Sequence, residues 1–228
     1  MISPEAREYL SQPAELVDTG TARIAFRRYG SGPAVLFIHG WPFSGFIYRR
    51  ILRRMAERFT CILVDLPGAG RSEWSVGNDF SFHGHADHLK KLVDALELPE
   101  YHLVAHDTGA TVARRLAVID GRARKLALID TEIPRHRPPL VPFMQKTLSL
   151  PGSAFVLRQL LKSDRYLRSY VGFGGCFEDL ALLEGEFHHE KRSLSRFTFD
   201  ANGTPAPVHN LLGDEKAQAD PVGPRGKK

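Results

Sequence analysis

The stretch AHDTG, at residues 105–109, lies between an expected strand (101–106) and an expected helix (108–119). The small residues at positions 105 and 109 indicate a strand-to-helix turn too tight for larger side chains. Such a turn places Asp107 at the helix N-terminus, where backbone N–H groups stabilise negative charge. Two interpretations are open: a carboxylate nucleophile, which is already ionised and can attack carbon directly, or an ordinary helix cap.

Strand-like and helix-like segments alternate on both sides of this turn. Ser81, for example, is an N-cap residue in front of a long amphipathic segment. This rhythm predicts an α/β fold with a mostly parallel sheet and helices on both faces. The expected strands are 15–20, 21–29, 33–39, 59–65, 101–106 and 125–130, and the expected helices are 49–58, 81–98 and 108–119. In the helix 49–58, Ile51, Leu52 and Met55 are expected on one face and the arginines on the opposite face.

The pattern changes after residue 130, which predicts three regions. Residues 1–130 are expected to form the α/β core. Residues 131–190 begin with several prolines and continue as loosely connected helical segments, which predicts a helical cap inserted over the sheet. Residues 191–228 are polar and rich in Pro and Gly, so they are expected to be a remnant of the core, with one possible strand, or a disordered tail.

Composition excludes several classes of function. The chain has 228 residues, 43% of them hydrophobic, and a formal net charge of +5. The basic residues are scattered rather than gathered in a stripe with aromatic residues, so nucleic-acid binding is not expected. The N-terminus is too polar for a signal peptide, and no apolar run approaches the ~18 residues of a membrane span. The sequence therefore predicts a cytoplasmic protein without membrane contact, and its oligomeric state is open.

Three motifs in order carry a resemblance to a known family. They are HGWP at 39–42, DLPGAGRS at 65–72 and AHDTG at 105–109. Together they resemble the α/β-hydrolase superfamily, in the branch with an aspartate nucleophile: haloalkane dehalogenases, fluoroacetate dehalogenases and epoxide hydrolases. The resemblance covers residues 15–190 and implies an enzyme that hydrolyses small molecules without a cofactor or a metal.

The resemblance also implies roles for individual residues. Asp107 would attack the substrate carbon and form an alkyl-enzyme ester, and the backbone N–H groups of Trp41 and Thr108 would form the oxyanion hole. His39 would hold its loop by hydrogen bonding. The indole of Trp41 would either face the substrate pocket or pack. Thr108 stands where relatives often have an aromatic residue or arginine, which slightly favours epoxides or a wider range of substrates.

The cap of epoxide hydrolases supplies tyrosines that protonate the epoxide oxygen. Tyr166 and Tyr170 are spaced i,i+4 and could line the pocket in this way, although they could also be ordinary core or surface tyrosines.

Two further groups of the family pattern are harder to find. One is an acid that orients the catalytic histidine, and it has two candidates, Asp214 and Asp130. The late histidine that activates water has none, because His209 lies inside a possible strand and no histidine follows it. The final strand and helix of the fold are therefore expected to be missing through truncation or a frame shift. Little or no turnover is expected, and the alternative to an active hydrolase is a catalytically inactive relative.

The stretch HGHADH at 83–88 offers a second alternative, a zinc-dependent hydrolase that uses His83, His85, Asp87 and His88. The motif leads into an amphipathic helix, however, and at helical pitch its histidines do not converge on one point. Surface histidines at a helix start are the expected interpretation.

Overall fold

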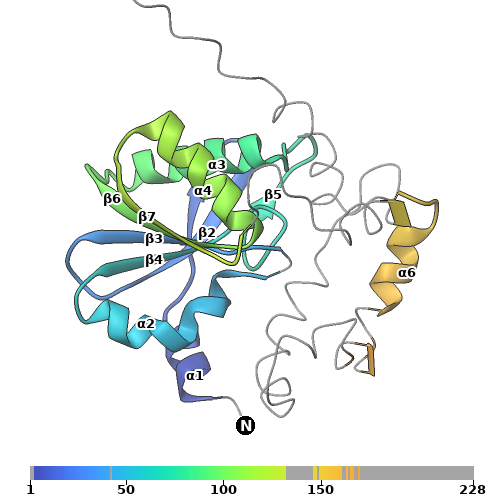
Figure 1. Ribbon diagram of the computed structural model, residues 1–228, viewed down its shortest axis with the longest axis horizontal. Coiled ribbons are helices and arrows are strands. Elements are labelled where there is room, and N and C mark those ends of the chain that lie inside the picture. Colours follow the sequence, from blue (N-terminus) through green and yellow to red (C-terminus); the bar gives the residue numbers. More distant parts are fainter. Residues whose placement is uncertain are drawn as a thin grey trace, which may run out of the picture.

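Seven strands form one sheet at the centre of the described protein (Figure 1). The computed structural model describes residues 3–41, 43–131, 146–147, 149–160, 163, 165–166 and 169. The strands are β1 (Glu15–Asp18), β2 (Ala22–Tyr29), β3 (Ala34–Ile38), β4 (Thr60–Asp65), β5 (Glu73–Trp74), β6 (Tyr101–His106) and β7 (Ala123–Ile129). The helices are α1 (Pro4–Ser11), the 3₁₀ helix η1 (Gly45–Tyr48), α2 (Arg49–Ala56), α3 (Phe82–Ala95), α4 (Thr108–Asp120) and α6 (Ser153–Leu160).

The strand order is β1-β2-β4-β3-β6-β7, with β5 paired to β2. The strands β4, β3, β6 and β7 run parallel, whereas β2 is antiparallel to both β1 and β4. This arrangement confirms the predicted mostly parallel sheet. Because the carboxyl ends of parallel strands meet at one edge, the loops after β3, β4 and β6 gather there.

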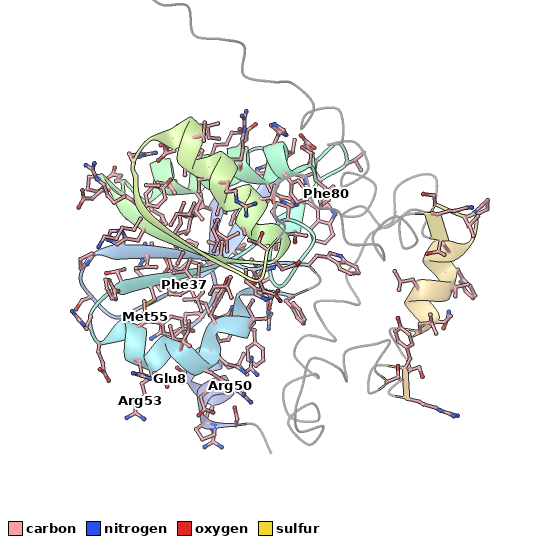
Figure 2. All side chains as sticks on the ribbon, viewed as in Figure 1. Glu8, Phe37, Arg50, Arg53, Met55 and Phe80 are labelled. Atoms are coloured by element: carbon pink, nitrogen blue, oxygen red, sulfur yellow. The ribbon has the colours of Figure 1, made fainter. Side chains whose placement is uncertain are left out.

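Helices cover both faces of the sheet, as predicted. In Figure 1, α3 and α4 lie above the sheet, and α1 and α2 lie below it. The upper core contains apolar residues of β2, β3 and β4 packed against α3 and α4. The lower core includes Phe37 and Tyr9, and Figure 2 shows Phe37 and Met55 on the side of α2. The strands β3 and β4 are almost continuously apolar because both of their faces are buried.

The structure adds three elements that were not expected from the sequence: α1, η1 and β5. Helix α1 begins with Pro4 after Ser3, whose hydroxyl accepts a hydrogen bond from the backbone N–H of Ala6. The helix is held to the sheet by Tyr9, which is buried and packs edge-on against Phe46. Strand β5 is only two residues long, too short to produce a sequence pattern.

The predicted faces of α2 are partly wrong. Leu52 is buried as expected, but Ile51 is exposed and Arg49 is buried. The guanidinium of Arg49 lies 4.3 Å from the centre of the Phe46 ring and donates a hydrogen bond to the Phe46 carbonyl. An aromatic ring on η1 therefore turns what was expected to be a solvent-facing arginine into a packed side chain.

The predicted domain boundaries stay a prediction. Residues 43–131 form an unbroken described stretch, whereas most of the expected cap (131–190) and all of the expected tail (191–228) lie outside the described residues. Among the helices that the structure describes, none combines the length and apolar character of a membrane span.

Candidate active site

The turn between β6 and α4 holds Asp107 in an uncommon backbone conformation. Its φ is 52° and its ψ is −133°, a region that residues other than glycine rarely occupy. The backbone N–H of Asp107 donates to the carbonyl of Ile129, the last residue of β7, over 3.0 Å. This hydrogen bond to the neighbouring strand helps to hold the turn in place.

Two glycines make room for this turn. A Cβ added to Gly109 would lie 2.7 Å from the carbonyl oxygen of Ile38 and closer still to that of His39. A Cβ added to Gly40 would lie 2.8 Å from the carboxyl carbon of Asp107. The loop after β3 and the start of α4 therefore approach at backbone distance, which confirms the expectation that position 109 excludes a larger side chain.

The side chain of Asp107 does not act as a helix cap. Asp107 occupies the N-cap position of α4 but makes no side-chain cap hydrogen bond. Its Oδ2 instead accepts a hydrogen bond from the hydroxyl of Thr108 over 3.2 Å. Of the two interpretations that the sequence left open, the structure disfavours the ordinary cap.

Thr108 connects Asp107 to the loop after β3. The backbone N–H of Trp41 donates to Thr108 Oγ1 over 2.9 Å, and this hydroxyl donates onward to Asp107 Oδ2. The sequence motifs predict that the N–H groups of Trp41 and Thr108 form an oxyanion hole, but they indicate no role for the threonine side chain. Only the fold shows that the hydroxyl reaches both partners.

The buried His39 joins two loops of the site. Its Nε2 accepts a hydrogen bond from the backbone N–H of Leu66, and its Nδ1–H donates to the carbonyl of Gly40. Burial lowers the pKa of His39, so the imidazole is neutral and both ring nitrogens are in use. The structure therefore agrees with the expectation that His39 holds its loop.

Asp65 holds the loop after β4 in the same manner. Its buried carboxylate accepts hydrogen bonds from the backbone N–H groups of Gly45 and Arg71, each over 2.9 Å. Its backbone carbonyl accepts one from the hydroxyl of Ser72. These hydrogen bonds show that the DLPGAGRS motif holds the conformation of the loop after β4.

Asp130, one of the two candidate acids, lies at the same edge of the sheet. It follows Ile129, and its side chain is 90% exposed. One carboxylate oxygen lies 3.9 Å from Nε2 of His106, the residue before Asp107. The other candidate, Asp214, lies outside the described residues.

A pocket opens beside Asp107, between the loops after β3 and β4 and the N-terminal turns of α3 and α4. It is lined by His39, Gly40, Trp41, Phe43, Leu66, Pro67, Gly68, Ala69, Phe80, Phe82, His85, Thr108 and Val112. Asp107 borders it through its contacts with Gly40 and Thr108. Phe80, one of the lining residues, is labelled in Figure 2. The lining is mainly aromatic and aliphatic, which suits a small apolar molecule.

Of the three residues expected to line the pocket, one is found in the described lining. Trp41 lines the pocket. Tyr166 is half-buried and does not belong to the described lining, and Tyr170 lies outside the described residues. The sequence analysis missed Phe80, Phe82 and His85, because residues before and within the first turn of α3 give no sign that they meet the loop after β3.

The expectation of surface histidines at the start of α3 is wrong for His85 and His88, which are only 7% and 5% exposed. His88 makes hydrogen bonds to Thr19 through Nδ1 and to Asn78 through Nε2. His85 faces the pocket instead. The described residues, which include all of 83–88, contain no group of three or more ligands that could hold a metal ion.

These buried histidines predict a loss of stability in acid. Burial lowers the pKa of His85 from 6.5 to about 3 and also lowers the pKa of His88. Both are neutral in the folded protein, so their full contribution is present above pH 6.5 and is lost as the pH falls from 6.5 towards 3. For His85 alone we expect the free energy of unfolding to fall by about 2 kcal/mol between pH 7 and pH 5. Urea unfolding at both pH values, compared with His85→Phe, measures this loss, and an equal pH dependence in the variant would contradict it.

Comparison with known proteins places the fold in a family. The family model described as alpha/beta hydrolase fold matches residues 33–198, more than half of the chain. The chain belongs to the α/β-hydrolase fold family. This finding confirms the resemblance seen in the sequence motifs, and it agrees with the sheet order and with the turn that presents Asp107.

Individual relatives lie in the dehalogenase and epoxide-hydrolase branch of the family. A haloalkane dehalogenase from Mesorhizobium japonicum is 37% identical over 54% of this chain and 41% of its own length. A fluoroacetate dehalogenase from a Burkholderia species is 35% identical over 45% of this chain and 35% of its own length. The structure of the epoxide hydrolase CorEH has a TM-score of 0.70 at 20% identity, over 91% of this chain and 75% of that one. The matched part is thus well under half the length of these two curated relatives.

Proposed function

We propose that this chain carries the site of a small-molecule hydrolase that uses Asp107 as its nucleophile, of the haloalkane dehalogenase or epoxide hydrolase type. The observation that carries the proposal is the strained turn that presents the Asp107 carboxylate beside an apolar pocket instead of using it as a helix cap. The names of the relatives support the same chemistry.

The proposed reaction starts with attack of one Asp107 oxygen on an electrophilic carbon of the substrate. A carbon–oxygen bond forms, and the carbon–halogen or carbon–oxygen bond of the substrate breaks, with its electron pair leaving on the halide or the epoxide oxygen. The product is an ester on Asp107. Water would then hydrolyse this ester. The hydroxyl of Thr108, which accepts a hydrogen bond from the Trp41 N–H and donates one to Asp107, would stabilise the charge that develops on the carboxyl oxygen.

A catalytically inactive relative is the second candidate. Such a relative would share the Asp107 nucleophile but lack a group that activates water. In that case Asp107 would be alkylated once and the ester would persist. The zinc hydrolase receives no support, because His88 is hydrogen-bonded to Thr19 and Asn78.

Peptide mass spectrometry tests the proposed nucleophile. The chain is incubated with 1-bromobutane or styrene oxide and digested under acidic conditions that preserve esters. We expect one added alkyl group on the peptide that contains Asp107. Labelling spread over several exposed carboxylates, without preference for this peptide, would argue against the proposal.

A matched pair of variants tests the hydroxyl of Thr108. Thr108→Val has nearly the same shape but cannot link Trp41 to Asp107, whereas Thr108→Ser keeps the hydroxyl. We expect the rate of Asp107 labelling to rise by about 10-fold in Thr108→Val, because a hydrogen bond to a charged group contributes about 1.5–3 kcal/mol and this one stabilises the carboxylate before it attacks. Labelling in Thr108→Ser should stay within about 3-fold of the parent chain. Equal rates in both variants would show that the hydroxyl has no part in the reaction.

A further inference from the structure

The pocket beside Asp107 contains a polar side chain for which the proposed reaction has no use. His85, in the first turn of α3, is 7% exposed and lines the pocket. Its ring packs edge-on against Phe80, with the ring centres 6.3 Å apart. Its Nδ1 is fully buried and has no hydrogen-bond partner among the residues that the structure describes.

Two other polar side chains of the pocket are already engaged. Both ring nitrogens of His39 take part in hydrogen bonds within the loops, and the hydroxyl of Thr108 links Trp41 to Asp107. A buried polar atom without a partner costs stability, and native structures rarely contain one without a reason. In His85 this atom belongs to a side chain that faces a space large enough to hold another molecule.

We propose that His85 recognises an uncharged oxygen group, such as a hydroxyl or a carbonyl, on a small and otherwise apolar ligand in this pocket. A neutral imidazole offers one donor and one acceptor, so it can bond either kind of oxygen group. Burial keeps this imidazole neutral, since it lowers the pKa of His85 to about 3.

The described lining residues favour a ligand group without negative charge. None of the lining residues that the structure describes is Asp, Glu, Lys or Arg. An anion such as a haloacetate would lose its water without gaining a cationic partner among these residues. Aromatic and aliphatic side chains of Phe43, Phe80, Phe82, Leu66 and Val112 suit the apolar body of the ligand.

Resting on the proposed function, this inference narrows the substrate class. The same pocket touches Gly40 and Thr108, both of which contact the side chain of Asp107. A ligand whose oxygen meets His85 would therefore place another part of its carbon skeleton towards Asp107. The structure favours a haloalkane or epoxide with an additional hydroxyl or carbonyl group over a plain hydrocarbon halide.

A matched pair of probes tests the recognition in the full chain. Cyclopentanol and methylcyclopentane have similar shapes, but only the alcohol can form hydrogen bonds. With the histidines labelled with ¹⁵N, we expect cyclopentanol to shift the ring nitrogen resonances of His85, and methylcyclopentane to leave them nearly unchanged. In His85→Leu the affinity for cyclopentanol should fall by about 5-fold, as expected for one neutral hydrogen bond. The affinity for methylcyclopentane should change by less than about 2-fold.

His83→Leu is the control, because it removes a neighbouring histidine of α3 that does not line the pocket. Equal losses for both probes in His85→Leu, or no shift of the His85 nitrogens by the alcohol, would overturn the recognition. Should His85→Leu fail to fold, the nitrogen shifts of the parent chain decide alone. Binding to Asp107→Asn, which cannot form the ester, separates the two proposals. If cyclopentanol binds at His85 but the parent chain forms no adduct at Asp107, the proposed nucleophile is wrong and the proposed role of His85 stands.

Discussion

Asp107→Asn is expected to abolish the covalent labelling of the site by 1-bromobutane or styrene oxide, with a rate at least about 100-fold below that of the parent chain. An amide is nearly the same size as a carboxylate but is uncharged and far less nucleophilic. The variant should also fold, because the side chain of Asp107 makes no cap hydrogen bond on which α4 depends.

Asp130→Asn is the matched control for this experiment. Its carboxylate lies at the same edge of the sheet and is far more accessible, at 90% exposure. If labelling reflected accessibility alone, Asp130 would be the preferred target. We expect Asp130→Asn to be labelled at residue 107 as fast as the parent chain, because an acid that orients a histidine acts only after the ester has formed. Retained labelling in Asp107→Asn would falsify the assignment of the nucleophile.

The fate of the ester distinguishes an active hydrolase from an inactive relative. An ester that persists for hours at one per chain indicates that no group activates water. An ester that disappears, with release of an alcohol or diol and with ¹⁸O from labelled water in the Asp107 carboxylate, indicates turnover and an unrecognised base.

Gly109→Ala is expected to cause the largest loss of stability of any single methyl group added at the site. The new Cβ would lie 2.7 Å from the carbonyl oxygen of Ile38 and closer to that of His39. Both obstacles are backbone atoms at the end of β3, so they cannot rotate away as a flexible side chain would. We expect the free energy of unfolding to fall by about 3 kcal/mol, at the upper end for overpacked sites.

Gly77→Ala provides the comparison. Gly77 has a φ of +90°, which is unfavourable for alanine, but an added Cβ would meet no atom within 4 Å. We expect this variant to lose only about 1–2 kcal/mol from backbone strain. Urea unfolding midpoints at a constant m-value compare the two directly. A Gly109→Ala chain as stable as Gly77→Ala would mean that the helix and the loop can move apart, and that the turn is less tightly held than the structure shows.

Much of the fold could be predicted from sequence because its signals are local. Buried parallel strands are short apolar runs, and the Ser81 cap marks the start of α3, where its hydroxyl accepts the Gly84 N–H as predicted. The tight turn around Asp107 also leaves a local trace, since a small residue is required at position 109. Elements held mainly by distant partners, such as α1 with its buried Tyr9, leave weaker signals.

The sequence by itself determined the order of the main strands and helices, the turn at Asp107 and the family to which the three motifs point. Each of these depends on neighbours within a few residues. Only the tertiary structure decided that Thr108 links Trp41 to Asp107 and that His85 faces the pocket. Trp41 and Thr108 are 67 residues apart. Contacts of this kind arise when parallel strands bring their carboxyl ends to one edge, and no pattern along the chain records which side chains then meet.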